Sequence, residues 1–125
     1  LIHTTSTSEM FEQIINIGEN DIMIGISFPR YSNRIINAVD FASSCGAKVV
    51  AITDSESSPI AKGAVAALYA KSDMASFADS LVAPLSIINA LLAAIGMKKK
   101  DEVARTLAHL ESVWDEYNVY DKKNR

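Results

Sequence analysis

The residues best suited to chemistry stand directly after a short apolar run, in the segment from Ser27 to Ser32. Hydroxyl groups begin and end this segment, and the guanidinium of Arg30 lies between them. The apolar run at 22–26 is typical of a buried β-strand, and a helical pattern begins at Asn33. Free N–H groups at the start of a helix, together with hydroxyls and a cation, favour an anion, most often a phosphate. The segment therefore predicts an anion-binding site.

The same segment has a purely structural interpretation. Ser32 or Asn33 could serve only to cap the helix that follows. Arg30 could be a solvated surface cation. Tyr31 could stack on a sugar ring or simply pack on the sheet. From the residues alone these alternatives stay open.

The elements around this segment predict a parallel sheet. The apolar run 22–26, continuous enough for a strand covered on both faces, is followed by a helix that Gly46 ends and by a strand at 49–53. Strand, helix, strand is the pattern of a right-handed crossover, and the apolar run 65–70 predicts a third parallel strand. Ligands bind beyond the carboxyl ends of such strands. The loop after the second strand carries Ser55 and Ser57, and Ser58 with Pro59 predicts a short helix.

Two further helices are predicted after the sheet. The segment from about 80 to 95 is apolar on nearly every side and is expected to end at Gly96. A surface helix cannot expose such a pattern, so either the last helix of the chain or another copy covers its outer face. We expect a homodimer or higher homo-oligomer. The segment 98–118 predicts an amphipathic helix with one apolar stripe, formed by Val103, Leu107, Leu110, Trp114 and Tyr117.

The composition limits the function classes. The net charge is −3 and the pI is about 5.3, which argues against a nucleic-acid surface on this chain. No histidine–cysteine cluster has the spacing of metal ligands, and no glycine motif for a dinucleotide or nucleotide cofactor is present. The apolar run 81–95 is short for a membrane span, and the lone Cys45 fits a reducing, cytoplasmic setting. The start at Leu1 suggests a fragment or a processed chain.

A resemblance rests on four stretches of the sequence: Ser27-Phe-Pro-Arg-Tyr-Ser32, residues 41–55, Ser58-Pro59, and residues 77–90. They resemble the sugar isomerase (SIS) domain, and more narrowly its version in RpiR-type transcriptional regulators, from about Thr5 to Ile95. The resemblance implies an α/β fold with three layers and a flavodoxin-like parallel sheet that lacks its first strand and helix. It implies one partial SIS domain over residues 1–125 and no DNA-binding domain in this chain.

The resemblance also implies the site residues. Ser27 and Ser32 match the first and last hydroxyl positions of the family's phosphate loop, and Phe28 contributes a backbone N–H. Pro29 and Arg30 depart from the wider family, which has serine and glycine there. Arg30 could then supply bidentate bonds to the phosphate. Tyr31, and Ser55 at the next strand end, complete the expected ligand-binding set.

The implied function is that of an effector domain that binds a phosphorylated sugar or amino sugar, without a cofactor or metal, in a regulator that meets DNA through a domain absent here. An SIS-type phosphosugar isomerase and a dimerisation module that binds nothing are the alternatives. Isomerisation needs a base, and the available carboxylates, in no recognised catalytic pattern, are Asp54, Glu56, Asp73 and Asp79. We therefore expect binding without turnover.

One edge of the strand at 22–26 is predicted to lack a neighbour within the sheet. Exposed edges are pairing sites. We expect this edge to be covered by another chain, by a rearrangement, or by the N-terminal residues.

Overall fold

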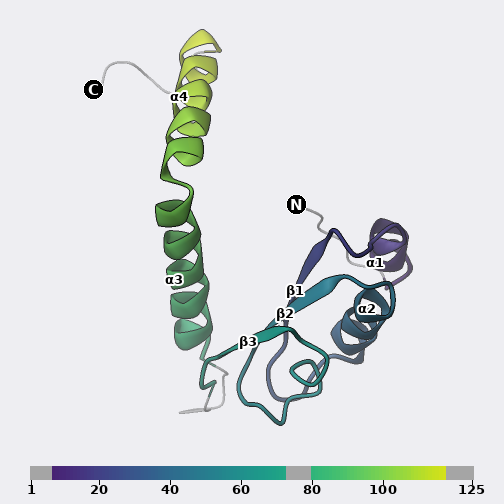
Figure 1. Ribbon diagram of the computed structural model, residues 1–125. Coiled ribbons are helices and arrows are strands. Elements are labelled where there is room, and N and C mark those ends of the chain that lie inside the picture. Colours follow the sequence, from purple (N-terminus) through teal and green to yellow (C-terminus); the bar gives the residue numbers. More distant parts are fainter. Residues whose placement is uncertain (1–6, 73–79, 118–125) are drawn as a thin grey trace. The chain divides into compact units, whose positions relative to one another are not determined.

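A computed structural model describes residues 7–72 and 80–117 of the chain (Figure 1). The elements in order are α1 (Thr7–Ile14), β1 (Ile22–Ile26), α2 (Asn33–Ser44), β2 (Lys48–Thr53), β3 (Ala66–Tyr69), α3 (Val82–Lys98) and α4 (Lys100–Glu116). The chain divides into two compact units, Leu1–Ile87 and Ile88–Arg125. The first unit carries the sheet and the second carries most of α3 and all of α4.

The three strands of the described residues form one parallel sheet in the order β1-β2-β3. Ile24 of β1 stands beside Val50 of β2, which stands beside Ala66 of β3. The α/β class and the parallel sheet flanked by helices are therefore confirmed, together with the three predicted strands. Because all strands run the same way, their carboxyl ends meet at one edge of the sheet.

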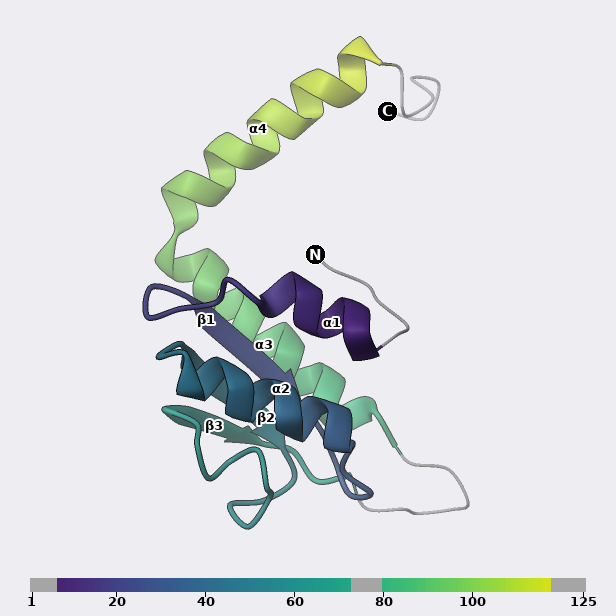
Figure 2. The ribbon, with the colours of Figure 1, turned by 90° about the vertical axis from the view of Figure 1, so that its right-hand side faces the viewer.

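Helices α1 and α2 lie on the same side of this sheet (Figure 2). Helix α2 contacts β1 and β2, and α1 contacts α2, where Phe11 and Phe41 meet edge to face with ring centroids 5.8 Å apart. Helix α2 approaches β1 so closely that a Cβ atom added at Gly25 would lie 2.7 Å from Cγ2 of Val39. Gly46, with a φ of +85°, ends α2 as predicted.

β1 was expected to be covered on both faces, but within the first unit the described residues cover only the face that meets α2. Ile22, Ile24 and Ile26 point away from α2 and remain 66%, 49% and 44% exposed. Within residues 7–72 and 80–117, β1 pairs only with β2, so no described strand covers its other edge. The N-terminal residues 1–6, which were one expected cover, lie outside the described residues.

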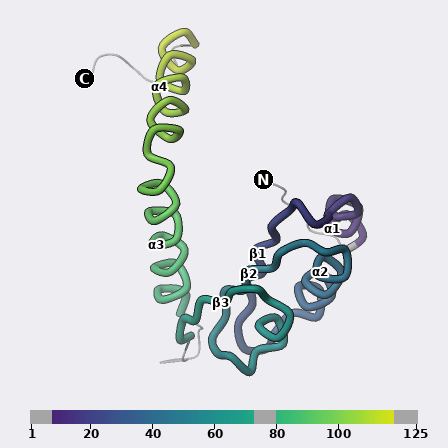
Figure 3. The backbone as a smooth tube through the Cα atoms, viewed as in Figure 1, coloured from purple at the N-terminus to yellow at the C-terminus, as the bar shows by residue number. Residues whose placement is uncertain are grey.

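The segment between β2 and β3 forms successive turns, so the short helix expected from Ser58 is wrong (Figure 3). These turns are held by backbone hydrogen bonds between residues three apart in the sequence, such as the bond from the Ala61 N–H to the Ser58 carbonyl. Ser58 is fully buried, and its hydroxyl contacts Thr53 instead of capping a helix. Ile60, also fully buried, anchors these turns on the core under α2.

Helix α3 continues through Gly96 to Lys98, so the expected stop at Gly96 is also wrong. Gly96 has no left-handed φ, and a glycine in an ordinary helical conformation weakens a helix without ending it. Pro84 lies in the first turn of α3, where its missing N–H costs no helical hydrogen bond. Of the described helices, none alone is long and apolar enough to cross a membrane. Helices α3 and α4 reach that length and composition only as a pair bent by 98°.

Candidate anion-binding site

The loop from Ser27 to Ser32 joins the carboxyl end of β1 to the first residue of α2. The N–H of Ser27 donates to the carbonyl of Ile52, 3.1 Å away, so the loop starts with its backbone fixed to β2. Ser27 is 7% exposed, whereas Ser32 is exposed at the other end of the loop. The two serines predicted to bind a phosphate are therefore at the same edge of the sheet.

Arg30 has a φ of +64°, the left-handed region that favours glycine. This is the position at which the wider SIS family was expected to carry glycine. The loop thus keeps a glycine-like backbone bend while it presents an exposed arginine. Holding a non-glycine residue there costs roughly 1–2 kcal/mol.

Ser32 occupies the N-cap position of α2, yet its side chain makes no capping hydrogen bond. Its carbonyl accepts hydrogen bonds from the N–H groups of Ile35 and Ile36. The helix begins at Asn33, so Asn33 is not the cap either. The alternative in which the Ser32 hydroxyl serves only to cap the helix is therefore wrong, and this exposed hydroxyl remains available to a ligand.

Tyr31 ties the loop after β1 to the loop after β2. Its hydroxyl donates to Oδ1 of Asp54 at 2.7 Å, a contact across 23 positions of the sequence. The phenol is half-buried. This contact was missed from the sequence, because nothing in the spacing of the two residues indicates that their loops meet.

A set of hydroxyl groups surrounds the same carboxylate. Ser55 Oγ donates to Oδ2 of Asp54 at 3.1 Å and lies 3.1 Å from Oγ of Ser57. Thr53 Oγ1 lies 3.1 Å from Asp54 Oδ1 and 2.8 Å from Ser58 Oγ. Thr53 and Ser58 are both fully buried. The predicted ligand residue Ser55 therefore donates its only hydroxyl hydrogen to Asp54. Towards a ligand, its hydroxyl oxygen can only accept a hydrogen bond.

These contacts shift two titrating groups in opposite directions. Burial by itself would raise the pKa of Asp54. The hydrogen bonds from Tyr31, from the backbone, from Ser55 and from Thr53 outweigh burial and hold that pKa below its ordinary value. The hydrogen bond to Asp54 is the main reason that the pKa of Tyr31 is raised, followed by burial of the phenol and the negative charge of Asp54. Near neutral pH the pair is thus a neutral phenol bonded to a carboxylate.

We expect Tyr31→Phe to destabilise the protein by about 1 kcal/mol at pH 7, because a hydrogen bond to a charged group is lost at a partly exposed site. Because the pKa of Asp54 is lowered, its hydrogen bonds stabilise the folded state fully above the ordinary pKa of 3.8. This stabilisation is lost as the pH falls through the pKa of Asp54 in the folded state. Because the pKa of Tyr31 is raised, its hydrogen bond stabilises the folded state fully below the ordinary pKa of 10.0. This stabilisation is lost as the pH rises through the pKa of Tyr31 in the folded state.

The difference in unfolding free energy between the natural protein and Tyr31→Phe should therefore be constant between these limits and shrink outside them. Urea unfolding at a series of pH values measures it. Tyr69→Phe, at an exposed tyrosine that ends β3, is the matched control and should show no effect. A Tyr31→Phe difference that keeps its size well below pH 3.8 would contradict the assignment to Asp54.

The structure does not describe three residues that the sequence brought into consideration. Asp73 and Asp79, considered as bases, lie outside the described residues, as does His3. Among the residues that the structure describes, no group of three histidine, cysteine, aspartate or glutamate side chains could hold a metal ion. A shallow hollow of about 310 Å³ lies at the other end of β1, the amino end, and is lined by Gln13, Ile14, Asn16, Ile17, Asp21 and Ile22.

Comparison with known proteins gives the context of this site. Residues 2–94 match the family model of the SIS domain. An uncharacterized HTH-type transcriptional regulator of Caldanaerobacter subterraneus subsp. tengcongensis is 30% identical over 103 residues, which are 79% of this chain and 36% of that protein. The chain therefore spans about a third of the length of this relative.

Two solved structures are also similar. A crystal structure of an RpiR transcription factor from Sphaerobacter thermophilus (sugar isomerase domain) is 28% identical with a TM-score of 0.80, and the match covers 90% of this chain and 62% of that one. A crystal structure of a hypothetical protein is 26% identical with a TM-score of 0.57, covering 68% and 52%. The chain thus belongs to the SIS domain family, and it is similar to the sugar isomerase domain of an RpiR transcription factor.

Proposed function

We propose that this chain is the effector part of an RpiR-type regulator and binds a phosphorylated sugar or amino sugar at the loop Ser27–Ser32. The observation that carries the proposal is the exposed hydroxyl of Ser32, which stands at the positive end of α2 without capping it. Ser27, the backbone N–H of Phe28 and the guanidinium of Arg30 would complete the phosphate contacts. In this proposal residues 1–125 act as a single partial SIS domain, and DNA is met only through a domain outside this chain.

Asp54 and the hydroxyl groups around it, from Tyr31, Thr53 and Ser55, suggest how the ligand would be oriented in the site. A carboxylate repels a phosphate but accepts hydrogen bonds from sugar hydroxyls or from an ammonium group. Donors from Tyr31, Thr53, Ser55 and the backbone already occupy Asp54, so about all four of its acceptor positions are filled. A sugar group on this side would meet the negative charge of Asp54 and the free lone pairs of Ser55. We therefore place the phosphate at the Ser32 end and the polar sugar groups towards Asp54 and Ser55.

We propose binding without turnover. A general base for aldose–ketose isomerisation needs a pKa close to the working pH, whereas its hydrogen bonds lower the pKa of Asp54 below 3.8 despite the opposing effect of burial. Release of product from hexose phosphates by the purified chain, abolished by Asp79→Asn, would favour the isomerase instead.

We further propose that the domain acts as a homodimer in the cytoplasm, where ligand binding would alter the DNA affinity of the whole regulator. The exposed isoleucines of β1 and the exposed apolar residues of α3, which include Leu85, Leu92 and Ile95, support a partner surface. If no sugar phosphate binds, the remaining function is that of a dimerisation module.

A thermal-shift screen of sugar phosphates and amino-sugar phosphates, with inorganic phosphate alongside, tests the proposal. A ligand at about 100 times its Kd stabilises the folded state by about 2.7 kcal/mol and should raise the Tm by roughly 8–15 °C. Ser32→Ala and Arg30→Ala should each lower the affinity about tenfold or more, because each removes a contact to a charged group. Ser43→Ala, at an exposed serine of α2 outside the loop, should leave the shift intact. No shift with any ligand would refute the proposed site.

The left-handed backbone of Arg30 allows a sharper test. We expect Arg30→Gly to leave the ligand-free protein as stable as the natural one or up to about 1 kcal/mol more stable, because glycine adopts this conformation without strain. The same variant should bind sugar phosphate as weakly as Arg30→Ala. Arg30→Lys, which keeps the charge but loses the planar fork, should bind with intermediate affinity. Full binding by Arg30→Gly would show that the guanidinium is not a ligand contact.

A further inference from the structure

The hydroxyl groups of Tyr31 and Ser55 both direct their hydrogens towards Asp54. Tyr31 donates to Oδ1 at 2.7 Å, and Ser55 donates to Oδ2 at 3.1 Å. A hydroxyl has only one hydrogen, so Ser57 must supply the hydrogen that joins its own Oγ to Oγ of Ser55, 3.1 Å away. A chain of donors therefore runs from Ser57 through Ser55 to Asp54, and a second donor reaches Asp54 from Tyr31.

The oxygens of these three hydroxyl groups form one surface that can only accept hydrogen bonds. Tyr31 and Ser55 are half-buried and Ser57 is exposed, so a ligand can meet their lone pairs. Ser55 also lies near enough to Tyr31 to offset part of the rise that Asp54 causes in the pKa of Tyr31. Tyr31, Ser55 and Ser57 are called the acceptor surface below.

Asp54 keeps its negative charge behind the acceptor surface. The groups that hold its carboxylate are neutral: the Tyr31 phenol, the hydroxyls of Thr53 and Ser55, and a backbone N–H. Despite burial, which acts in the opposite direction, these bonds keep the pKa of Asp54 below its ordinary value. A hydroxyl that donates to a carboxylate is polarised and becomes a stronger acceptor itself. The acceptor surface is therefore negative and has no hydrogen to offer.

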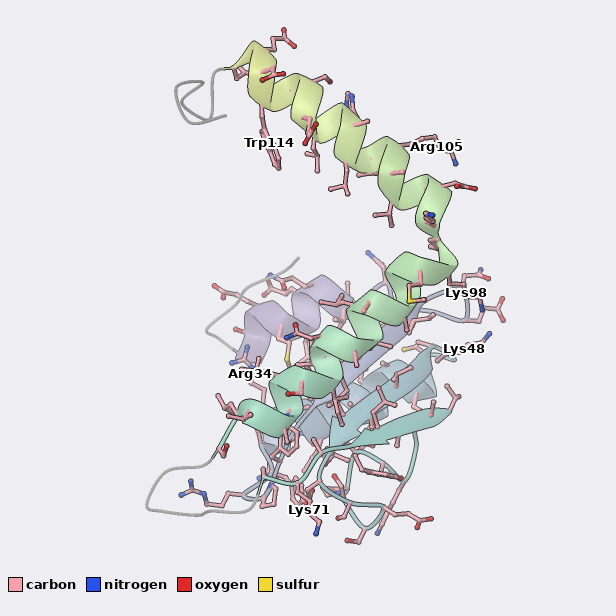
Figure 4. The ribbon with its side chains drawn as sticks, turned by 90° about the vertical axis from the view of Figure 1, so that its left-hand side faces the viewer. Arg34, Lys48, Lys71, Lys98, Arg105 and Trp114 are labelled. Atoms are coloured by element: carbon pink, nitrogen blue, oxygen red, sulfur yellow. The ribbon has the colours of Figure 1, made fainter. Side chains whose placement is uncertain are left out.

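The charges along this edge of the sheet alternate in sign. Because β2 is the middle strand, the end that carries Asp54 lies between the end of β1, followed by Arg30, and the end of β3, followed by Lys71. Figure 4 shows Lys71 at the end of the sheet opposite to Lys48, the first residue of β2. A negative centre beside a cation complements a ligand that carries a phosphate and a positive group on different atoms.

We propose that Asp54 and the acceptor surface make the site specific for a phosphorylated sugar that carries a free, protonated amino group. This inference rests on the proposed phosphate site at Ser27–Ser32 and narrows the class of its ligand. An ammonium group has three hydrogens and no lone pair, so it can donate to the three oxygens while the charge of Asp54 attracts it. A carboxylate at this place would be repelled, and an N-acetyl group would bring a carbonyl oxygen against the lone pairs of the surface.

Isothermal titration calorimetry of the whole chain with four sugar 6-phosphates tests the inference. Glucosamine 6-phosphate should bind about tenfold more tightly than glucose 6-phosphate, because charge-assisted hydrogen bonds are about twice as strong as neutral ones. N-acetylglucosamine 6-phosphate and 6-phosphogluconate should bind more weakly than glucose 6-phosphate. If glucosamine 6-phosphate binds no better than the other three, this inference is wrong and the proposed function stands. If no sugar phosphate binds at all, both fail.

Asp54→Asn removes the charge while it keeps the shape of the side chain. The ratio of the Kd for glucose 6-phosphate to the Kd for glucosamine 6-phosphate should fall from about ten to about one. A structural defect alone would weaken both ligands alike and leave this ratio unchanged. Glu56→Gln makes the same chemical change at a neighbouring exposed carboxylate and should leave the ratio within about twofold of its natural value. An Asp54→Asn chain that keeps the natural preference would contradict the inference.

The proton on the ligand gives a test that does not depend on the folding of a variant. An amino group on a sugar carbon, like an α-amino group, loses its proton at about pH 8. The preference of the natural chain for glucosamine 6-phosphate should therefore shrink to about twofold between about pH 7 and about pH 9.5. A preference that keeps its size at the higher pH would overturn the inference.

The protein itself keeps the charge of this pair constant over that range. The pKa of Asp54 lies below 3.8, where its hydrogen bonds hold it against the effect of burial, and Asp54 raises the pKa of Tyr31 above 10.0. The other charged residues at this edge of the sheet and in the first turn of α2 are Arg30, Arg34, Glu56 and Lys71. Their effect on the phosphate is common to both ligands, so glucose 6-phosphate titrated in parallel is the reference.

Discussion

Gly25→Ala should destabilise the first unit by about 2–3 kcal/mol, the cost of overpacking a filled core. The new methyl group would lie 2.7 Å from Cγ2 of Val39, a distance at which one of the two must move. Val39 is 1% exposed in the core between α2 and the sheet, so its short, branched side chain has no space to retreat. For a chain of this size the Tm should fall by roughly 8–15 °C.

Three variants control this prediction. Val39→Ala alone should cost about 2 kcal/mol through the space it leaves. The double variant Gly25→Ala/Val39→Ala should lose clearly less unfolding free energy than the two single variants lose together. Gly96→Ala, where no atom lies within 4 Å of the added Cβ, should instead gain up to about 1 kcal/mol from helix propensity. Urea unfolding at one fixed protein concentration measures all four. A Gly25→Ala loss below about 0.5 kcal/mol would contradict the close approach of α2.

Thr53→Val should be the second most damaging of these substitutions, with a loss of about 2–3 kcal/mol. The change keeps the shape of the side chain but removes the hydroxyl that contacts Asp54 and Ser58. Ser58 is fully buried, so its hydroxyl would lose Thr53 as a partner without gaining water, which costs more than the net value of the bond itself. The loop after β2 should also exchange its backbone amides faster.

The matched variants separate the hydroxyl from the methyl group. Thr53→Ser keeps the hydroxyl and should cost only about 1 kcal/mol, the value of one buried methyl group. Thr53→Val/Ser58→Ala removes both partners and should cost less than the sum of the single changes. Strict additivity of the two single losses would show that Thr53 and Ser58 do not depend on each other.

Residues 22–70 show how far local pattern carries a prediction. The apolar runs gave all three strands because β-strands covered by a helix must be apolar at the positions that the helix contacts, such as Val49 and Ala51. The end of α2 was predicted correctly because Gly46 there has a left-handed φ. Gly96 carries the same residue type, but α3 continues through it to Lys98. Glycine permits a helix end without requiring one.

The site was predictable where it follows directly from chain order. Ser27 and Ser32 flank the junction of β1 and α2, so the position of both follows from the strand–helix pattern. The bond from Tyr31 to Asp54 joins two loops whose distance depends on how α2 packs, and no short-range signal encodes that distance. The turn from Ser58 to Gly63 was missed for the same reason, since a capping signature cannot show that the Ser58 hydroxyl is held by Thr53 in the interior.

The bare side of β1 matters during synthesis. Residues 22–53 are close in sequence, so strand, helix and strand can assemble soon after they leave the ribosome. The row formed by Ile22, Ile24 and Ile26, and the edge of β1 that no described strand pairs with, would then meet other nascent chains before any native cover arrives. Such a surface promotes non-native strand addition, so the yield of intact protein should fall steeply as expression rises and recover when a chaperone binds that row first.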